Sequence, residues 1–279
     1  ISSTVSQSLL GWDMPTLDTG IDTPAESAIL IIMMIYVVAA LINLKIPDTG
    51  ARYVSQKTNP IELIKDFSIC FKTLWNDRLG QISLAVTTLF WGAGATLQFI
   101  VIKWAQVALH LTLSQGAILQ AISAVGVAGG AVWAAWRIPL KDSLKVLPYG
   151  VVMGFVVCIL AIYNADMLPN TTLMTIGKLE LSLNLLPAYF LLIIVGWLAG
   201  YFVVPMNALL QHRGHVLMSA GHSIAVQNFN ENISVLTMLL VYSLLIWLDA
   251  PIQFVIIGFG LAVSAIMWLV IKRHARNQA

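Results

Sequence analysis

Apolar residues dominate seven stretches of the chain, and short polar segments separate them. A membrane-spanning helix needs about 20 mostly apolar residues to cross the hydrocarbon core. The stretches that meet this requirement cover residues 25–46, 80–104, 115–136, 146–164, 185–210, 217–247 and 250–271. The pattern predicts an all-α, polytopic membrane protein with seven transmembrane helices. The sixth stretch is long enough to include a tilt or a helical extension.

The lysines and arginines lie almost entirely on one side of these helices. Residues 1–24 contain none, whereas the end of the first span and the segment that follows it contain six. When alternate loops are grouped, one side holds thirteen of the fifteen basic residues. Because cytoplasmic loops carry the excess of Lys and Arg, we expect the residue 1 end to lie outside and the C-terminus to lie in the cytoplasm.

Composition and motifs argue against an enzyme. The chain is 58% hydrophobic and 10% charged, whereas about 25% of the residues of a soluble domain are charged. Its two cysteines, Cys70 and Cys158, have no metal or redox spacing. The sequence also lacks a cluster of metal-ligating residues, a P-loop and a nucleophile elbow. We therefore expect no catalytic residue, no cofactor, no bound metal and no nucleic-acid partner.

The segment 47–79 is the longest loop on the basic side. Asn59 can cap a helix, Pro60 suits its first position, and Glu62 follows three residues after the cap. Apolar residues then recur at helical spacing, at Ile61, Ile64, Phe67, Phe71, Leu74 and Trp75. The pattern predicts a short interfacial helix, which either packs on the bundle as an amphipathic linker or binds a partner.

The spacing of the spans predicts a division into segments. One span, a long basic loop and six closely spaced spans are typical of a major facilitator protein whose first five helices are missing. We expect an external loop at 1–24, the last helix of the N-terminal half at 25–46, a central cytoplasmic loop at 47–79 and a six-helix domain at 80–279. The chain begins without Met, so we expect it to start inside a longer protein. A seven-helix receptor remains the competing interpretation, although the last span lacks the lysine of a retinal protein.

Polar side chains gather in four of the spans. The first, fourth and seventh spans are almost uniformly apolar in their middles, so we expect them to be peripheral and the other four to line a central path. The polar residues include Thr87, Thr88, Thr96, Gln98, Gln120, Ser123, Asn207, Gln211, Ser223, Gln227, Asn228, Asn230, Glu231 and Asn232.

Glu231 is the only acidic residue well inside a span. It lies about 14 residues into the sixth span, or roughly 21 Å at 1.5 Å per residue, which is close to the middle of the membrane or slightly beyond. Gln227 precedes it by one turn on the same face, and Asn228 and Asn232 form the adjacent row. This stripe predicts either a water-accessible substrate path or an interhelical hydrogen-bond network. Lys103 should lie near the outer surface, too far away to pair with Glu231.

Two stretches closely resemble bacterial lysophospholipid transporters of the major facilitator superfamily. They are residues 90–97 (FWGAGATL) and residues 203–232, which contain VVPMNALLQ, RG, SAG, IAVQN and EN in that order. The resemblance extends from about residue 28 to the end and is densest at 201–232. It implies that the spans correspond to helices six to twelve of such a transporter.

The resemblance implies a function and a location. Members of this family move lysophosphatidylethanolamine and lysophosphatidylglycerol from the outer to the inner leaflet of the bacterial inner membrane. There an acyltransferase/acyl-acyl carrier protein synthetase restores the missing chain. The expected partners are thus a lysophospholipid, the bilayer, that enzyme and the N-terminal half of the same protein. The substrate path should include Glu231, Asn228, Gln227, Asn232, Gln98, Thr88, Trp91 and Asn207, with Phe90, Trp91 and Phe99 bordering the lipid tail.

The resemblance departs at Gln98, where some members of the family carry an arginine suited to a phosphate. Lys103 follows five residues later, about 140° around the helix, so it does not replace that charge. The alternatives left open are a major facilitator transporter of another amphipathic or small solute, a seven-helix receptor and a purely structural membrane protein.

Overall fold

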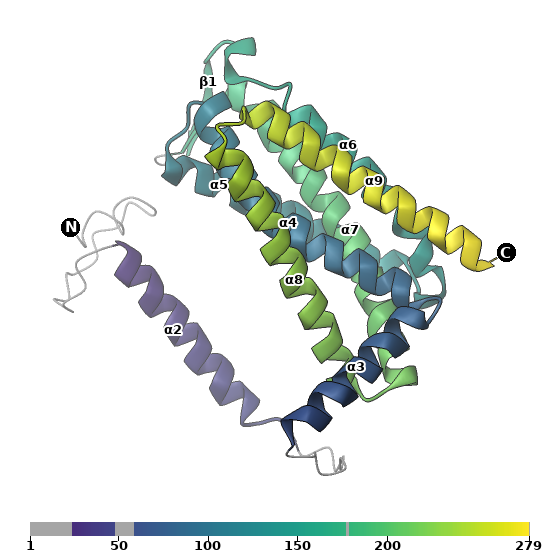
Figure 1. Ribbon diagram of the computed structural model, residues 1–279. Helices are drawn as coiled ribbons and strands as arrows, with labels where there is room; N and C mark the ends of the chain where they lie inside the picture. The colour runs from purple at the N-terminus through teal and green to yellow at the C-terminus, as the bar shows by residue number, and fades with distance from the viewer. Residues whose placement is uncertain (1–23, 48–58, 177–178, 279) are drawn as a thin grey trace. The chain divides into compact units, whose positions relative to one another are not determined.

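The computed structural model describes residues 24–47, 59–176 and 179–278 (Figure 1). These residues fall into two compact units. One unit contains helix α2 and strands β1 and β2, and the other contains helices α3 to α9. The predicted external loop at 1–24 lies almost wholly outside the described residues, as does the 48–58 part of the predicted central loop.

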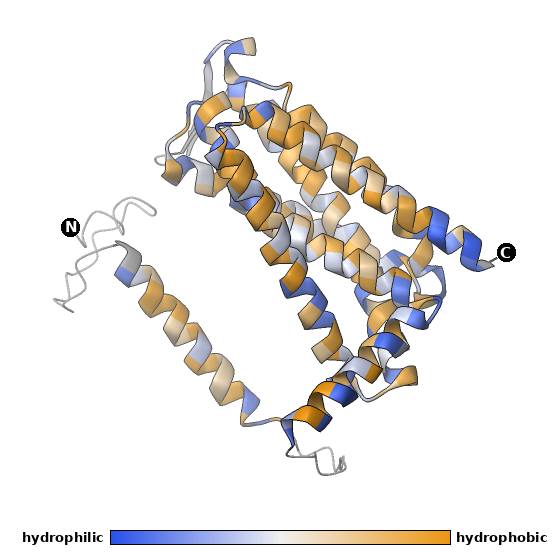
Figure 2. Cartoon of the chain, viewed as in Figure 1, coloured by the Kyte–Doolittle hydropathy of each residue, from blue (hydrophilic) through white to orange (hydrophobic). Residues whose placement is uncertain are grey.

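The prediction of a polytopic all-α membrane protein is confirmed. Within the described residues, seven helices are long and apolar enough to cross a membrane, and Figure 2 shows that hydrophobic residues predominate along them. They are α2 (Pro24–Asn43), α4 (Gly80–Ala108), α5 (Leu113–Arg137), α6 (Leu147–Leu160), α7 (Leu186–Leu217), α8 (Ala220–Trp247) and α9 (Ile252–Gln278). A 3₁₀ helix, η1 (Leu140–Val146), leads into α6 and completes that span.

Short elements occupy the loop between α6 and α7. A 3₁₀ turn, η2 (Ala165–Met167), follows α6, and strands β1 (Thr172–Ile176) and β2 (Leu179–Ser182) form an antiparallel pair. A second 3₁₀ turn, η3 (Leu183–Leu185), precedes α7. The Tyr163 hydroxyl donates a hydrogen bond of 2.6 Å to the backbone oxygen of Asn184, which ties the end of α6 to the start of α7.

Helix α7 extends seven residues beyond the predicted end of its span. The sequence predicts a turn around His212, Arg213 and His215, but the helix continues to Leu217 and the turn is centred on Met218. Ser219 then caps α8, its hydroxyl accepting a hydrogen bond from the backbone N–H of His222. The prediction failed because a helix can continue through polar residues at the end of a span when their side chains have partners. Here the Arg213 side chain bonds to Asp77.

Reciprocal glycine pairs hold α5 and α7 together. A β-carbon added at Gly126 or Gly130 would meet the backbone oxygen of Ile193 or Trp197 at 2.5 or 2.0 Å. A β-carbon at Gly196 or Gly200 would likewise meet backbone oxygens of α5. The GxxxG pair of α5 and that of α7 therefore lie in one interface, where the two backbones come into direct contact. Gly126 contacts Ile193, and Gly130, one turn later, contacts Trp197, one turn later on α7. The two helices therefore run parallel.

The remaining helices form two further pairs. Helices α6 and α9 are antiparallel and meet at Gly154 and Gly260, where each added β-carbon would lie 2.5 Å from the other glycine's oxygen. Helices α4 and α8 run parallel, with Gly92 against Ser234 and the Tyr242 hydroxyl donating to the backbone oxygen of Phe99. Small residues thus set the closest approaches of all three pairs.

The predicted amphipathic helix is α3 (Pro60–Asn76), and Asn59 caps it by accepting from the Ile61 N–H at 3.1 Å. Leu74 is fully buried with residues of α4, α7 and α8, while Phe67 and Phe71 pack against Phe229 of α8. The second half of α3 therefore packs on the bundle. Ile61 is 76% exposed, so the first turn is uncovered, and its place at a membrane surface stays a prediction.

Candidate functional site

Three of the predicted path residues meet between α7 and α8. The Gln227 side-chain amide donates to Glu231 Oε1 at 2.7 Å and to Asn207 Oδ1 at 3.2 Å. Asn207 follows Pro205 inside α7, and Gln227 and Glu231 are one turn apart on α8. We call Asn207, Gln227 and Glu231 the polar triad. All three side chains are half-buried, so the triad is reachable from outside the helix pair.

The triad lies well inside both helices. Because α8 begins at Ala220, Glu231 is about 16 Å from its start, and Asn207 is about 15 Å from the end of α7. The hydrocarbon core is about 30 Å thick, so these distances fit the predicted position near the middle of the membrane. That depth stays a prediction. A carboxylate at that depth is held here by a neutral amide, and a carboxylate is costly in a membrane unless it is paired, hydrated or protonated.

The other asparagines of α8 do not join the triad. Asn228 and Asn232 form an exposed row, in which the Asn232 amide donates to the backbone oxygen of Asn228 at 2.7 Å. Asn230 is only 9% exposed, and its amide donates to the backbone oxygen of Val226. The polar stripe read from the sequence thus divides into a triad, an exposed row and a buried residue.

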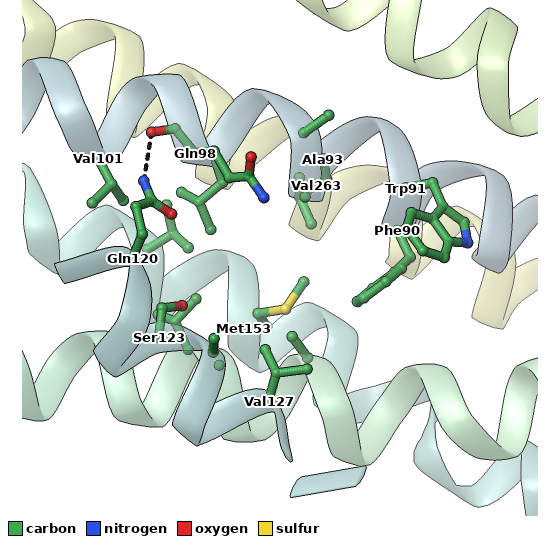
Figure 3. Close-up of a pocket in the computed structure, with 18 of the residues that line it drawn as sticks. Phe90, Trp91, Ala93, Gln98, Val101, Gln120, Ser123, Val127, Met153 and Val263 are labelled. Carbon is green, nitrogen blue, oxygen red and sulfur yellow. Dashed lines mark hydrogen bonds between the residues drawn. The ribbon is translucent and has the colours of Figure 1, made fainter. Parts of the chain in front are cut away.

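A cavity of about 510 Å³ lies beside this stripe (Figure 3). Helix α4 contributes Phe90, Trp91 and Gln98, and α5 contributes Gln120 and Ser123. Its other walls are apolar and come from α6, α7, α8 and α9, including Met153, Val157, Val195, Val235, Phe259 and Val263. We call this space the central cavity. Its volume falls within the range of about 300–1,000 Å³ found for ligand sites.

The polar groups of the central cavity lie toward one end. The Gln120 side-chain amide donates to the backbone oxygen of Gln98 at 2.8 Å, which leaves the Gln98 side-chain amide for other partners (Figure 3). Phe90 and Trp91 lie at the other end, in an edge-to-face contact with centroids 5.8 Å apart. The space therefore combines amide and hydroxyl groups with a long apolar surface, which suits an amphipathic molecule.

Five of the eight predicted path residues belong to the triad or to the central cavity, and Asn228, Asn232 and Thr88 belong to neither. Gln98 and Trp91 line the central cavity, whereas the buried hydroxyl oxygen of Thr88 has no hydrogen-bond partner and lies outside that lining. Val235 of α8 also lines the cavity, and Glu231 is one helical turn before it. The triad is therefore adjacent to the cavity on α8. Phe99 is not part of the cavity lining. The side chains that α6 and α9 contribute to the central cavity are apolar. The sequence prediction followed polar residues, so it did not identify them as part of the cavity.

Sequence reasoning also missed an ion pair at one end of the bundle. Arg213 of α7 binds Asp77 with two nitrogens, at 3.0 and 2.5 Å, and Asp77 also accepts from the backbone N–H groups of Leu79 and Gly80 at the start of α4. Burial alone would raise the pKa of Asp77. The hydrogen bonds from Arg213, Gly80 and Leu79 and the charge of Arg213 together outweigh it, so the pKa lies below the usual value. The pair joins α4 to α7 across 136 residues of chain.

Comparison with known proteins decides the relationship. The lysophospholipid transporter LplT of Shigella boydii serotype 4 is 37% identical over 241 residues, which is 85% of this chain and 56% of that protein. The proteins of the same name from Escherichia coli O1:K1 and O9:H4 match with the same identity and coverage. This chain is a homologue of the LplT lysophospholipid transporters.

The chain spans a little over half the length of the LplT proteins it matches. Their names are those of transporters, which supports the prediction that the chain is not an enzyme. No protein-family model and no solved structure matches the chain. The relationship to LplT therefore rests on sequence identity, and the geometry of the triad and the central cavity comes from this structure.

Proposed function

We propose that this chain is the larger part of an LplT-type transporter that moves lysophospholipids across a bacterial inner membrane. The observation that carries the proposal is the central cavity, whose amides and apolar walls lie beside the Glu231 carboxylate in a homologue of LplT. A lysophospholipid has one polar head and one tail, so it requires this combination. The proposed substrates are lysophosphatidylethanolamine and lysophosphatidylglycerol, moved from the outer to the inner leaflet.

Each polar group has a proposed role. The Gln98 amide and the Gln120 and Ser123 side chains offer hydrogen bonds to the phosphate and glycerol oxygens of the head. Glu231 attracts the head amine or a coupling cation, while Gln227 and Asn207 hold its carboxylate in place. Asn228, Asn232 and Thr88 complete the path on either side. Phe90 and Trp91 border the tail.

The proposed topology follows from the basic residues. The residue 1 end is periplasmic and the C-terminus is cytoplasmic. Helix α2 is then the last helix of an N-terminal half, residues 47–79 form the central cytoplasmic loop, and residues 80–279 form the C-terminal half. The two halves of the full protein would alternate access to the site, and an acyltransferase/acyl-acyl carrier protein synthetase would consume the lipid delivered to the inner leaflet.

A reacylation assay tests the proposal. The full-length gene is expressed in a strain that lacks its own lysophospholipid transporter but can reacylate, and labelled lysophosphatidylethanolamine is added to spheroplasts. Conversion to diacyl lipid that depends on the gene supports inward transport. If conversion is absent while the protein is present in the membrane, the substrate is a different amphipathic or small solute. Labelled lysophosphatidylglycerol in the same assay gives the headgroup preference.

A further inference from the structure

A second hollow lies on the other side of α4, between α8 and α9. Its volume is about 400 Å³, and its floor is formed by Thr96 and Ile100 of α4. Val241 and Leu245 of α8 face Phe254 and Gly258 of α9 across it. We call this space the α8/α9 groove. It lies at the end of the bundle where α8 finishes and α9 begins.

The groove follows from the way the helices pair. Helix α8 packs mainly on α4, and α9 packs mainly on α6, so the two helices have few contacts with each other. Figure 1 shows them diverging from their shared turn. Asp249 in that turn has a φ of 53°, the left-handed conformation that reverses a chain tightly. Side chains of α8 and α9 therefore leave a space between the two helices, which is the groove.

The groove is lined mostly by apolar side chains, and its polar ones are Thr96, Thr237 and Tyr242. The Thr96 hydroxyl donates to the backbone oxygen of Gly92 at 2.9 Å, and the Tyr242 hydroxyl donates to that of Phe99 at 3.3 Å. Two of the three polar side chains are thus already bonded to α4, while Val241 and Phe254 are 52% and 71% exposed. A polar head or a peptide would lose its hydrogen bonds to water here, whereas a hydrocarbon chain would not.

One side chain separates the groove from the central cavity. Phe259 of α9 lines both spaces, and no other residue that the structure describes does so. The two spaces therefore adjoin at Phe259, and a molecule with its head beside Gln98 reaches the groove with its tail only past this side chain. Under the proposed topology, the groove also lies in the outer-leaflet half of the membrane, where the tail of an arriving lysophospholipid is found.

We propose that the α8/α9 groove holds the single acyl tail of a lysophospholipid whose head occupies the central cavity. This inference rests on the proposed function. The tail reaches the groove from the membrane between α8 and α9, and Phe259 separates it from the head. Tail length would then be sensed in the groove, independently of the groups that recognise the head.

Filling the groove tests this assignment in the full-length protein. An added β-carbon at Gly258 meets no heavy atom within 4 Å, so Gly258→Phe places a ring in the groove without a backbone clash and removes a helix-weakening glycine. Leu261→Phe is the matched control, because Leu261 is on the same helix, is 47% exposed and lines neither space. Both variants are compared with the native protein at equal membrane abundance.

The readout is transport of lysophosphatidylethanolamine with a palmitoyl or a hexanoyl tail. Gly258→Phe should raise the KM for the palmitoyl lipid about tenfold, as expected when about two methylenes lose their apolar contact, and leave the hexanoyl lipid unchanged. Leu261→Phe should change neither. Equal effects of Gly258→Phe on both lipids, or none on either, would overturn the assignment. A native protein that transports neither lipid would instead refute the proposed function.

A cross-linking experiment needs no substitution. Lysophosphatidylethanolamine carrying a diazirine at the end of its tail is photolysed with the native protein in membranes, and the labelled peptides are identified. Labelling of α8 and α9 around Val241 and Gly258 that excess unlabelled lysophosphatidylethanolamine suppresses would support the assignment. Labelling that only diacyl phosphatidylethanolamine suppresses would show a bilayer lipid in the groove and overturn it, as would labelling confined to other helices.

Discussion

Helices α7 and α8 follow one another in the chain and differ in how they are buried. In the most apolar 18-residue stretch of α7, 61% of the residues are buried, whereas in the corresponding stretch of α8 only 6% are buried. Helix α7 packs closely on α5 and also contacts α4 and α6. Helix α8 packs mainly on α4 and carries four of the eight predicted path residues, two of them half-buried and two exposed. Helix α7 therefore mainly packs the bundle together, and α8 carries most of the polar side chains of the candidate site.

The difference shows what each kind of residue does in a membrane. Apolar contact adds little between helices in lipid, so α7 gains its burial through glycines that let backbones touch. Polar side chains cost free energy in lipid, so Gln227 and Glu231 of α8 are placed where another surface or water can reach them. Substitutions in α7 should therefore reduce the amount of folded protein in the membrane, and substitutions at the polar residues of α8 should reduce transport.

The largest effect is expected at the glycine interface. Gly130→Leu would place a side chain against the backbone oxygen of Trp197, which lies 2.0 Å from an added β-carbon. The helices would have to separate, and we expect a loss of about 3 kcal/mol or more of unfolding free energy. Membrane abundance and thermal unfolding in detergent measure this loss.

Gly129→Leu is the control for that experiment, because an added β-carbon at Gly129 meets only the edge of the Trp197 ring, at 3.8 Å. Its stability should stay close to that of the native protein. If both variants unfold alike, the damage comes from a larger residue in this part of α5, and the close packing of α5 on α7 is not its cause.

The second effect concerns the ion pair that joins α7 to α4. Asp77→Ala removes the partner of Arg213 and two hydrogen bonds at the start of α4, and Asp77 and Arg213 side chains are 14% and 23% exposed. We expect a loss of about 2 kcal/mol, below the value for a fully buried pair. A double-mutant cycle with Arg213→Ala isolates the coupling, and additive effects would show that the pair itself contributes nothing.

The same pair predicts a pH dependence. The pKa of Asp77 is lowered in the folded protein, so its contribution is present above the unfolded value of about 3.9 and is lost as pH falls through the lower folded value. The stability difference between native protein and Asp77→Ala should thus be constant near neutral pH and shrink below about pH 4. A difference that grows on acidification would contradict this sign.

The third effect should appear in activity alone. Glu231→Gln keeps the shape of the side chain and its hydrogen bond with Gln227 but removes the charge. We expect transport to fall about tenfold while membrane abundance stays normal. Glu62→Gln, the same change on α3, serves as the control and should transport normally. Unchanged transport by Glu231→Gln would assign the triad to holding α7 and α8 together.

The smallest effect is expected at an exposed ion pair. Lys145 lies 2.9 Å from Asp142, but its side chain is 74% exposed. Because water and salt weaken such pairs, Lys145→Ala should cost at most about 0.5 kcal/mol of unfolding free energy. Thermal unfolding beside Asp77→Ala provides the comparison, and a cost equal to that of Asp77→Ala would show that burial does not separate the two pairs.

The membrane spans could be predicted because hydrophobic length alone determines them. The C-terminal end of α7 could not, since residues 211–217 are polar enough for a loop but continue the helix, where Arg213 contacts Asp77. Nothing in the local sequence links two residues so far apart. The cap at Asn59 was predictable for the opposite reason, because it depends only on residues within one turn.

The candidate site was predictable in its polar residues and not in its walls. The one-turn spacing of Gln227 and Glu231 places them on one face, and their hydrogen bond follows. The contact of Gln227 with Asn207 depends on how α7 and α8 pack, and the sequence pattern does not contain that information. Met153, Val157 and Val263 line the central cavity through the packing of α6 and α9, and in the sequence they resemble any lipid-facing residue.

The glycine pairing of α5 with α7 also sets an order of assembly. Helices α4 and α5 are consecutive, so the bond from Gln120 to the Gln98 backbone can form as soon as α5 is inserted. Gly126 and Gly130 must wait until α6, the strands and α7 have been synthesised. During that interval α5 exposes an unfilled glycine face to lipid or to the insertion machinery. Ribosome pausing within α7 would prolong this exposure and should be the most damaging point at which to slow translation of the chain.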